Sequence, residues 1–145
     1  MYKGFVTILL AIFAYFNSSA QSRVAATIKN FKNDNGVCRA CLFDNAGAFT
    51  GEGGKPYECL VIPVKNKLAQ VVFDNVKPGK YAMFVFHDAN NNNKIDKNFI
   101  GIPKEGYGAS RNKLPFAAAP KFDENKFEVQ GSKQIAIAIE LRHVL

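Results

Sequence analysis

The sequence predicts an all-β sandwich that forms a single domain. Short runs of alternating apolar residues recur along the chain, turn residues separate them, and no long segment has a helical period. The clearest alternation covers residues 134–142, where apolar side chains occupy every second position from Ile135 to Leu141. Residues 21–145 are enough for one domain with a single hydrophobic core.

Residues 1–20 have the composition of a secretory signal peptide. Lys3 precedes an apolar run from Gly4 to Phe16, and small residues lead to a cleavage site after Ala20. The apolar run is shorter than the roughly 20 residues of a membrane-spanning helix, which argues against the alternative of a membrane anchor. We expect export to the periplasm, the outer surface or the medium, with no transmembrane segment after cleavage.

The charge distribution bears on partners. The formal net charge is +7, and the basic residues are spread along the chain. Spread basic residues indicate a solvated surface with some preference for anionic partners such as cell-surface polymers. An exported protein seldom meets nucleic acid, so no nucleic-acid binding is expected.

The first strands follow from alternation and turn signals. Segments 23–31 and 37–43 alternate, and Asn35-Gly36 between them is typical of a tight turn, so the two segments are expected to form a β-hairpin. Residues 44–56 are rich in Gly, Asn and Thr and are expected to form a loop.

Three further segments continue this pattern. Residues 57–65 and 68–73 alternate as strands. The strand expected over 81–87 follows a Pro78-Gly79 turn and is apolar on both faces, so it should lie in the middle of a sheet.

The C-terminal part is less regular. Residues 99–120 show little periodicity, 122–127 could form one helical turn, and 134–142 are the last strand.

The turn that leads to Gly79-Lys80-Tyr81 resembles one found in transthyretin-like and carboxypeptidase-regulatory-like sandwiches. The resemblance implies an immunoglobulin-like or transthyretin-like β-sandwich in which this tyrosine is an anchor for packing and hydrogen bonding. It implies no activity.

A possible metal-binding loop follows the strand at 81–87. Asp88, Asn90, Asn92 and Asp96 carry oxygens at loop positions one, three, five and nine, which is the spacing of a calcium loop. The backbone carbonyl of Lys94 would be a further ligand. The sequence therefore predicts a structural calcium site as the cofactor site of this protein.

Two features set this loop apart from an EF-hand. Position twelve is Phe99 instead of glutamate, and strands flank the loop instead of helices. Glu105 could fold back and supply the missing carboxylate. With so few carboxylates, the expected dissociation constant is roughly 10⁻⁴ to 10⁻³ M. The alternative is an Asn-rich turn whose side chains bind their own backbone.

Two side chains beside the loop are candidates for its support. His87 precedes the loop and is expected to orient it through a hydrogen bond, since the sequence ties no nucleophile to it. Tyr107 is expected to pack in the loop, although an exposed tyrosine could stack on a sugar or a peptide. A catalytic role for the His87–Glu105 region, acting on glycans, is the alternative function.

The cysteines are assigned by strand faces. Alternation places Cys41 and Cys59 on outer faces and Cys38 in the core, which predicts a Cys41–Cys59 disulfide and a buried free thiol. A β-bulge in this strand would exchange the faces on which Cys38 and Cys41 lie, and Cys38 would then be the partner of Cys59. A zinc site made by the three cysteines with His87 would require converging thiols, which the alternation does not allow.

The loop sequences also carry a family resemblance. The stretches HDANNNNKID (87–96), FIGIPKEGYGAS (99–110) and PKF (120–122) resemble exported bacterial proteins of the domain of unknown function 2141 family. This resemblance implies an exported single domain and no established activity.

These observations together favour an exported, calcium-binding, non-catalytic binding module of the bacterial cell envelope, with an unidentified envelope or extracellular ligand. A purely structural accessory protein with a metal-free loop is a third hypothesis. A deep pocket that holds His87, Glu105 and Tyr107 together would favour the enzyme.

Overall fold

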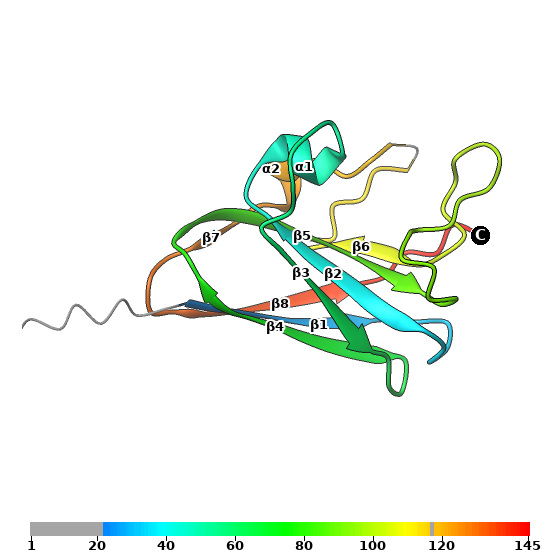
Figure 1. Cartoon of the computed structure of the whole chain (residues 1–145), viewed down its shortest axis with the longest axis horizontal. Coiled ribbons are helices and arrows are strands. Elements are labelled where there is room, and N and C mark those ends of the chain that lie inside the picture. The colour runs from blue at the N-terminus through cyan, green and yellow to red at the C-terminus, as the bar shows by residue number, and fades with distance from the viewer. Residues whose placement is uncertain (1–21, 117) are drawn as a thin grey trace, which may run out of the picture.

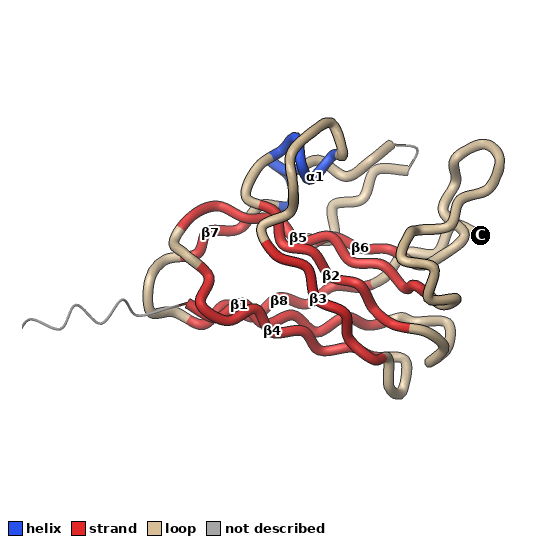
Figure 2. Tube along the Cα trace, viewed as in Figure 1, coloured by secondary structure: helices blue, strands red, loops and turns tan. Residues whose placement is uncertain are grey.

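Two β-sheets pack face to face in the computed structural model (Figure 1, Figure 2). The structure describes residues 22–116 and 118–145, so the signal peptide expected over residues 1–20 lies outside the described residues. The 3-stranded sheet has the order β4-β1-β8, and the 5-stranded sheet has the order β3-β2-β5-β6, with β7 also paired to β5. This arrangement confirms the all-β sandwich.

The elements have the following bounds: β1 Ser22–Lys29, β2 Val37–Phe43, α1 Ala46–Thr50, β3 Glu58–Pro63, β4 Leu68–Val76, β5 Gly79–Asp88, β6 Tyr107–Ala109, α2 Phe122–Asn125, β7 Phe127–Val129 and β8 Gln134–Glu140.

The core lies between the inner faces of the two sheets. In β1 the alternate residues Val24, Ala26 and Ile28 are buried, as their spacing predicted. β1 pairs with β4 in an antiparallel register and with β8 in a parallel one. The central strand of this sheet is therefore built from the segment that begins the domain.

The predicted hairpin between the first two strands is wrong. β1 belongs to the 3-stranded sheet, whereas β2 pairs with β3 and β5 in the other sheet. Both edges of β1 are taken by β4 and β8, so the connection 30–36 crosses between the sheets. Phe31 is buried in this connection while residues 32–35 are exposed, so the chain crosses at the surface of the sandwich and directs one apolar side chain into the core.

β5 is covered on both faces, as its apolar composition predicted. Met83 and Val85 face the core between the sheets. Ala82 and Phe84 belong to a second apolar cluster with Phe49 of α1. The short helix α1 forms where a loop was expected.

Side-chain and backbone caps explain why α1 forms. The Asn45 side chain accepts a hydrogen bond from Ala48 N at 2.8 Å, and Gly51 ends the helix with a φ of 79°.

Two short strands lie where the sequence showed no alternation. β6 and β7 contain three residues each and both pair with β5. Three residues are too few for a period-two pattern to be recognised. A Cβ on Gly108 of β6 would lie 2.6 Å from Ile139 Cγ2, so close packing requires glycine at this position. The expected helical turn is present as α2.

Candidate functional site

The predicted metal-binding loop leaves the end of β5 and returns to the sheet at β6 (Figure 1). A hydrogen bond from His87 N to Gly106 O, 2.8 Å long, closes its base. The loop is therefore held at both ends by strands that pair with each other, and it projects from one end of the sandwich.

The carboxylate of Asp88 is fully buried at the start of the loop. Its Oδ1 accepts a hydrogen bond from Asn92 N at 3.0 Å, and its Oδ2 accepts one from Asn93 N at 3.0 Å. Arg39 of β2 places its Nε 2.5 Å from Oδ2, and its guanidinium also donates to the Asn93 side chain. Asp88 thus makes an ion pair and also caps the turn that follows it.

These contacts change the acidity of the group. Burial on its own would raise the pKa of Asp88, but the Arg39 hydrogen bond, the Asn93 and Asn92 N–H groups and the Arg39 charge lower that pKa below its ordinary value. The carboxylate is therefore ionised at neutral pH.

The side chains at positions three, five and nine converge. Asn90 Nδ2 donates to one Asp96 oxygen at 2.7 Å, and Asn92 Nδ2 donates to the other at 2.8 Å. Both asparagines therefore direct their side-chain amides at the same carboxylate. A half-turn of each side-chain amide group exchanges its oxygen and nitrogen. Such a turn would direct the amide oxygens of Asn90 and Asn92 toward the centre of the loop.

Glu105 folds back onto the loop, but its contacts are with backbone. Its Oε1 accepts from Ala89 N at 3.0 Å, and its Oε2 accepts from Asp96 N at 2.9 Å. The side chain therefore ties the second and ninth positions of the loop together. Lys94 is exposed, and its backbone N–H donates to Asn92 Oδ1 at 3.2 Å.

Sequence reasoning missed Arg39. Its partner Asp88 is 49 residues away, and Arg39 occupies an ordinary strand position. The β2–β5 register pairs Val37 with Asp88, which places Arg39 two residues along the neighbouring strand. Only the register brings the two side chains together, so local spacing held no signal for this ion pair.

His87 supports a different loop from the one expected. It is buried, and its Nε2 donates to Asn35 O at 2.6 Å. Its ring meets Phe31 edge-on with centroids 5.0 Å apart. These contacts fasten the 30–36 connection to the end of β5.

Among the residues that the structure describes, no group of three His, Cys, Asp or Glu side chains is placed to hold a metal ion. A calcium site here would consequently depend on amide and backbone oxygens besides the carboxylates. The described residues also include no helix long and apolar enough to cross a membrane.

The structure contains the Cys41–Cys59 disulfide that the strand faces predicted. The two residues lie opposite each other in the β2–β3 register, with Cα atoms 4.1 Å apart. Cys38 is a buried free thiol, and burial raises its pKa to about 12. The thiols do not converge, so the zinc alternative has no geometric support.

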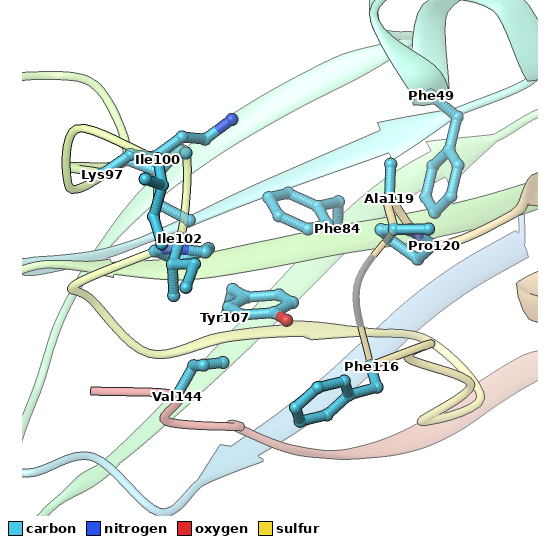
Figure 3. A pocket seen from close by; sticks show the side chains of 14 residues that line it. Phe49, Phe84, Lys97, Ile100, Ile102, Tyr107, Phe116, Ala119, Pro120 and Val144 are labelled. Carbon is cyan, nitrogen blue, oxygen red and sulfur yellow. The ribbon is translucent and has the colours of Figure 1, made fainter.

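An apolar cavity of about 520 Å³ lies beside the loop (Figure 3). Tyr107 of β6 lies in its wall and stacks on Phe84 of β5 with centroids 6.2 Å apart. Neither His87 nor Glu105 lines this cavity, so this cavity is not the pocket that would have favoured an enzyme. The lining residues are Phe49, Phe84, Ile95, Lys97, Ile100, Gly101, Ile102, Pro103, Tyr107, Phe116, Ala118, Ala119, Pro120 and Val144.

Comparison with known proteins identifies a family and nothing more specific. No curated protein matches the chain. No solved structure matches it either, so the resemblance to transthyretin-like sandwiches remains unconfirmed. One family model, described as uncharacterized protein conserved in bacteria (DUF2141), matches residues 26–137, and the chain therefore belongs to this family.

Proposed function

We propose that the protein is an exported, non-catalytic binding module of the bacterial cell envelope whose 88–105 loop binds calcium weakly. The observation that carries the calcium proposal is the convergence of Asn90 and Asn92 on the Asp96 carboxylate. Turning the two amides would present their oxygens together with those of Asp96, and hard cations prefer such an oxygen set. Asp88 and the carbonyl of Lys94 complete the expected ligands.

The same geometry bears on affinity. Arg39 already neutralises Asp88, and Glu105 binds two backbone N–H groups. Calcium must therefore compete with existing contacts, so the expected dissociation constant is about 10⁻³ M, the weak end of the range for extracellular modules. A loop that works at this affinity would respond to extracellular calcium levels.

Export is supported by the composition of residues 1–20 and by the Cys41–Cys59 disulfide. Disulfides persist in oxidising compartments and are rare in the cytosol. Intact-mass analysis of the exported protein should give a chain that begins at Gln21. Retention of residues 1–20 in the exported material would contradict this part of the proposal.

Thermal unfolding tests calcium binding directly. At 10 mM calcium and a dissociation constant of about 10⁻³ M, mass action predicts a gain of about 1.4 kcal/mol in stability. Magnesium chloride at the same concentration is the control for ionic strength. Magnesium demands a stricter octahedral geometry than calcium, so it should not give the same gain in stability.

Matched variants locate the ion. Asp96→Asn should abolish the calcium-dependent gain, since it removes the carboxylate at the point where the loop side chains converge. Asp74→Asn, an exposed aspartate on β4, should keep the full gain. A wild-type melting temperature that 10 mM calcium does not change would refute calcium binding.

A further inference from the structure

The cavity beside the loop has the features of a ligand pocket. Its volume of about 520 Å³ falls within the roughly 300–1,000 Å³ typical of small-molecule sites. Its lining is mostly aliphatic and aromatic, and it combines α1, β5, β6, the 95–103 turn, residues 116 and 118–120 and the C-terminal tail. Such a lining binds an apolar group of a ligand.

Exposed apolar side chains surround this cavity. Phe116 and Ile100 line it and are 90% and 64% exposed, and Phe99, which precedes Ile100 in the turn, is 99% exposed. Large apolar side chains grouped at a cavity mark an interaction site more strongly than single exposed residues do.

Hydrogen bonds fix the turn that presents these residues. Asn98 Oδ1 accepts from Ile100 N at 3.1 Å and from Ile102 N at 2.9 Å. Gly101 has a φ of 85°, and Lys97 pairs with Pro103 at the base of the turn. The exposure of Phe99 and Ile100 is therefore built into the turn.

The opposite wall is anchored in a similar way. Asn125 is fully buried, and its Nδ2 donates to Lys113 O and to Lys121 O, both at 3.0 Å. These two bonds hold Lys113 and Lys121, which come before Phe116 and after Pro120 in the chain. Hydrogen bonds therefore anchor the backbone near both sides of the cavity.

The polar groups of the cavity indicate the head group of the ligand. Lys97 is the one charged residue in the lining, and it forms no ion pair with any residue in 22–116 or 118–145. In Figure 3 Lys97 lies on the turn at the edge of the cavity, and Tyr107 lies between Ile102 and Phe116. An apolar interior with one cation at its rim is complementary to a ligand with an apolar chain and an anionic end.

We propose that this cavity binds an anionic amphiphile, with its acyl chain among the apolar side chains and its head group paired with Lys97. The shared chemistry covers free long-chain carboxylates and single-chain phospholipids with an anionic head. The proposal deepens the binding role proposed above by naming the ligand class, and it does not depend on calcium.

Calorimetric titration in EDTA tests the proposal, because EDTA prevents calcium soaps and separates this test from calcium binding. Dodecanoate, dodecyl phosphate, 1-dodecanol and dodecyltrimethylammonium, each below its aggregation limit, share one chain length and differ in charge. Both anions should bind at one site per chain, the alcohol more weakly and the cation weakest. Preference for dodecanoate indicates a carboxylate source, and preference for dodecyl phosphate a phospholipid source.

Variants assign the site. Lys97→Glu reverses the charge of an exposed side chain and should weaken dodecanoate binding by roughly fivefold, while dodecanol binding stays unchanged. Lys104→Glu, an exposed lysine of the same connection outside the cavity lining, is the matched control and should have no effect. Ala119→Trp should abolish binding of all four compounds by filling the cavity, and its exposed position leaves the core intact.

Three results would overturn the proposal. The first is the absence of dodecanoate binding by the wild-type protein up to its solubility limit. The second is binding that Ala119→Trp leaves unchanged in a variant with the wild-type melting temperature. The third is a dimer in solution that Phe99→Ser dissociates, which would assign the apolar surface to a second copy of the chain.

Discussion

The buried ion pair between Asp88 and Arg39 is the contact on which the loop depends most, and a conservative substitution tests it. Asp88→Asn keeps the size of the side chain but removes its charge. It also replaces one acceptor oxygen by an NH₂ group that faces the N–H donors of Asn92, Asn93 or Arg39. We expect the variant to fold with a less stable loop.

The size of the effect follows from burial. Asp88 is 0% exposed, and the Arg39 side chain is 21% exposed. Removing one partner of a buried pair leaves the other charge uncompensated and costs about 3–5 kcal/mol. The free energy of unfolding, measured by urea denaturation in EDTA, should fall by this amount.

The chain contains a matched control for this substitution. Arg23 and Asp74 form a contact of similar geometry, Nε to Oδ1 at 2.7 Å, but their side chains are 55% and 56% exposed. Exposed ion pairs contribute about 0–1 kcal/mol, so Asp74→Asn should change stability by less than about 1 kcal/mol. Equal costs for Asp88→Asn and Asp74→Asn would refute the argument from burial.

The pH dependence gives a second measurement on the same variant. Because the pKa of Asp88 is lowered in the folded state, its contribution to stability is fully present above its unfolded pKa of about 3.9. That contribution is lost as the pH falls through the folded pKa. The stability difference between wild type and Asp88→Asn should therefore be constant above about pH 5 and shrink at lower pH. A difference that does not shrink on acidification would show that ionised Asp88 is not its source.

Two further predictions concern the cysteines. Replacing Cys41 and Cys59 by serine removes a disulfide that closes a loop with a sequence separation of 18. The chain-entropy model predicts a loss of about 3 kcal/mol in the free energy of unfolding, measured with urea. An unchanged urea midpoint would contradict this estimate. Burial raises the pKa of the Cys38 thiol to about 12. In the folded protein at pH 8 this thiol should therefore not react with a thiol reagent, whereas in denaturant it should react at once. Fast labelling of the native chain would show that β2 opens readily.

The sequence by itself determined the parts of this protein that depend on near neighbours along the chain. Alternation identified most of the strands and their buried faces, as in β1 and β8. The same alternation separated Cys38 from Cys41 and led to the correct disulfide partner, because side-chain direction reverses at each residue of a strand. Motif spacing identified the family and placed Asn90, Asn92 and Asp96 in one loop.

Only the tertiary structure decided which strands are neighbours. The Asn35-Gly36 signal suggested a hairpin, but β1 has β4 and β8 at its edges, and strand pairing depends on segments far apart in the chain. The register of β2 against β5 brought Arg39 to Asp88, which no local pattern could indicate. The apolar cavity likewise combines residues from Phe49 to Val144, and its position depends on packing between elements that are individually unremarkable in sequence.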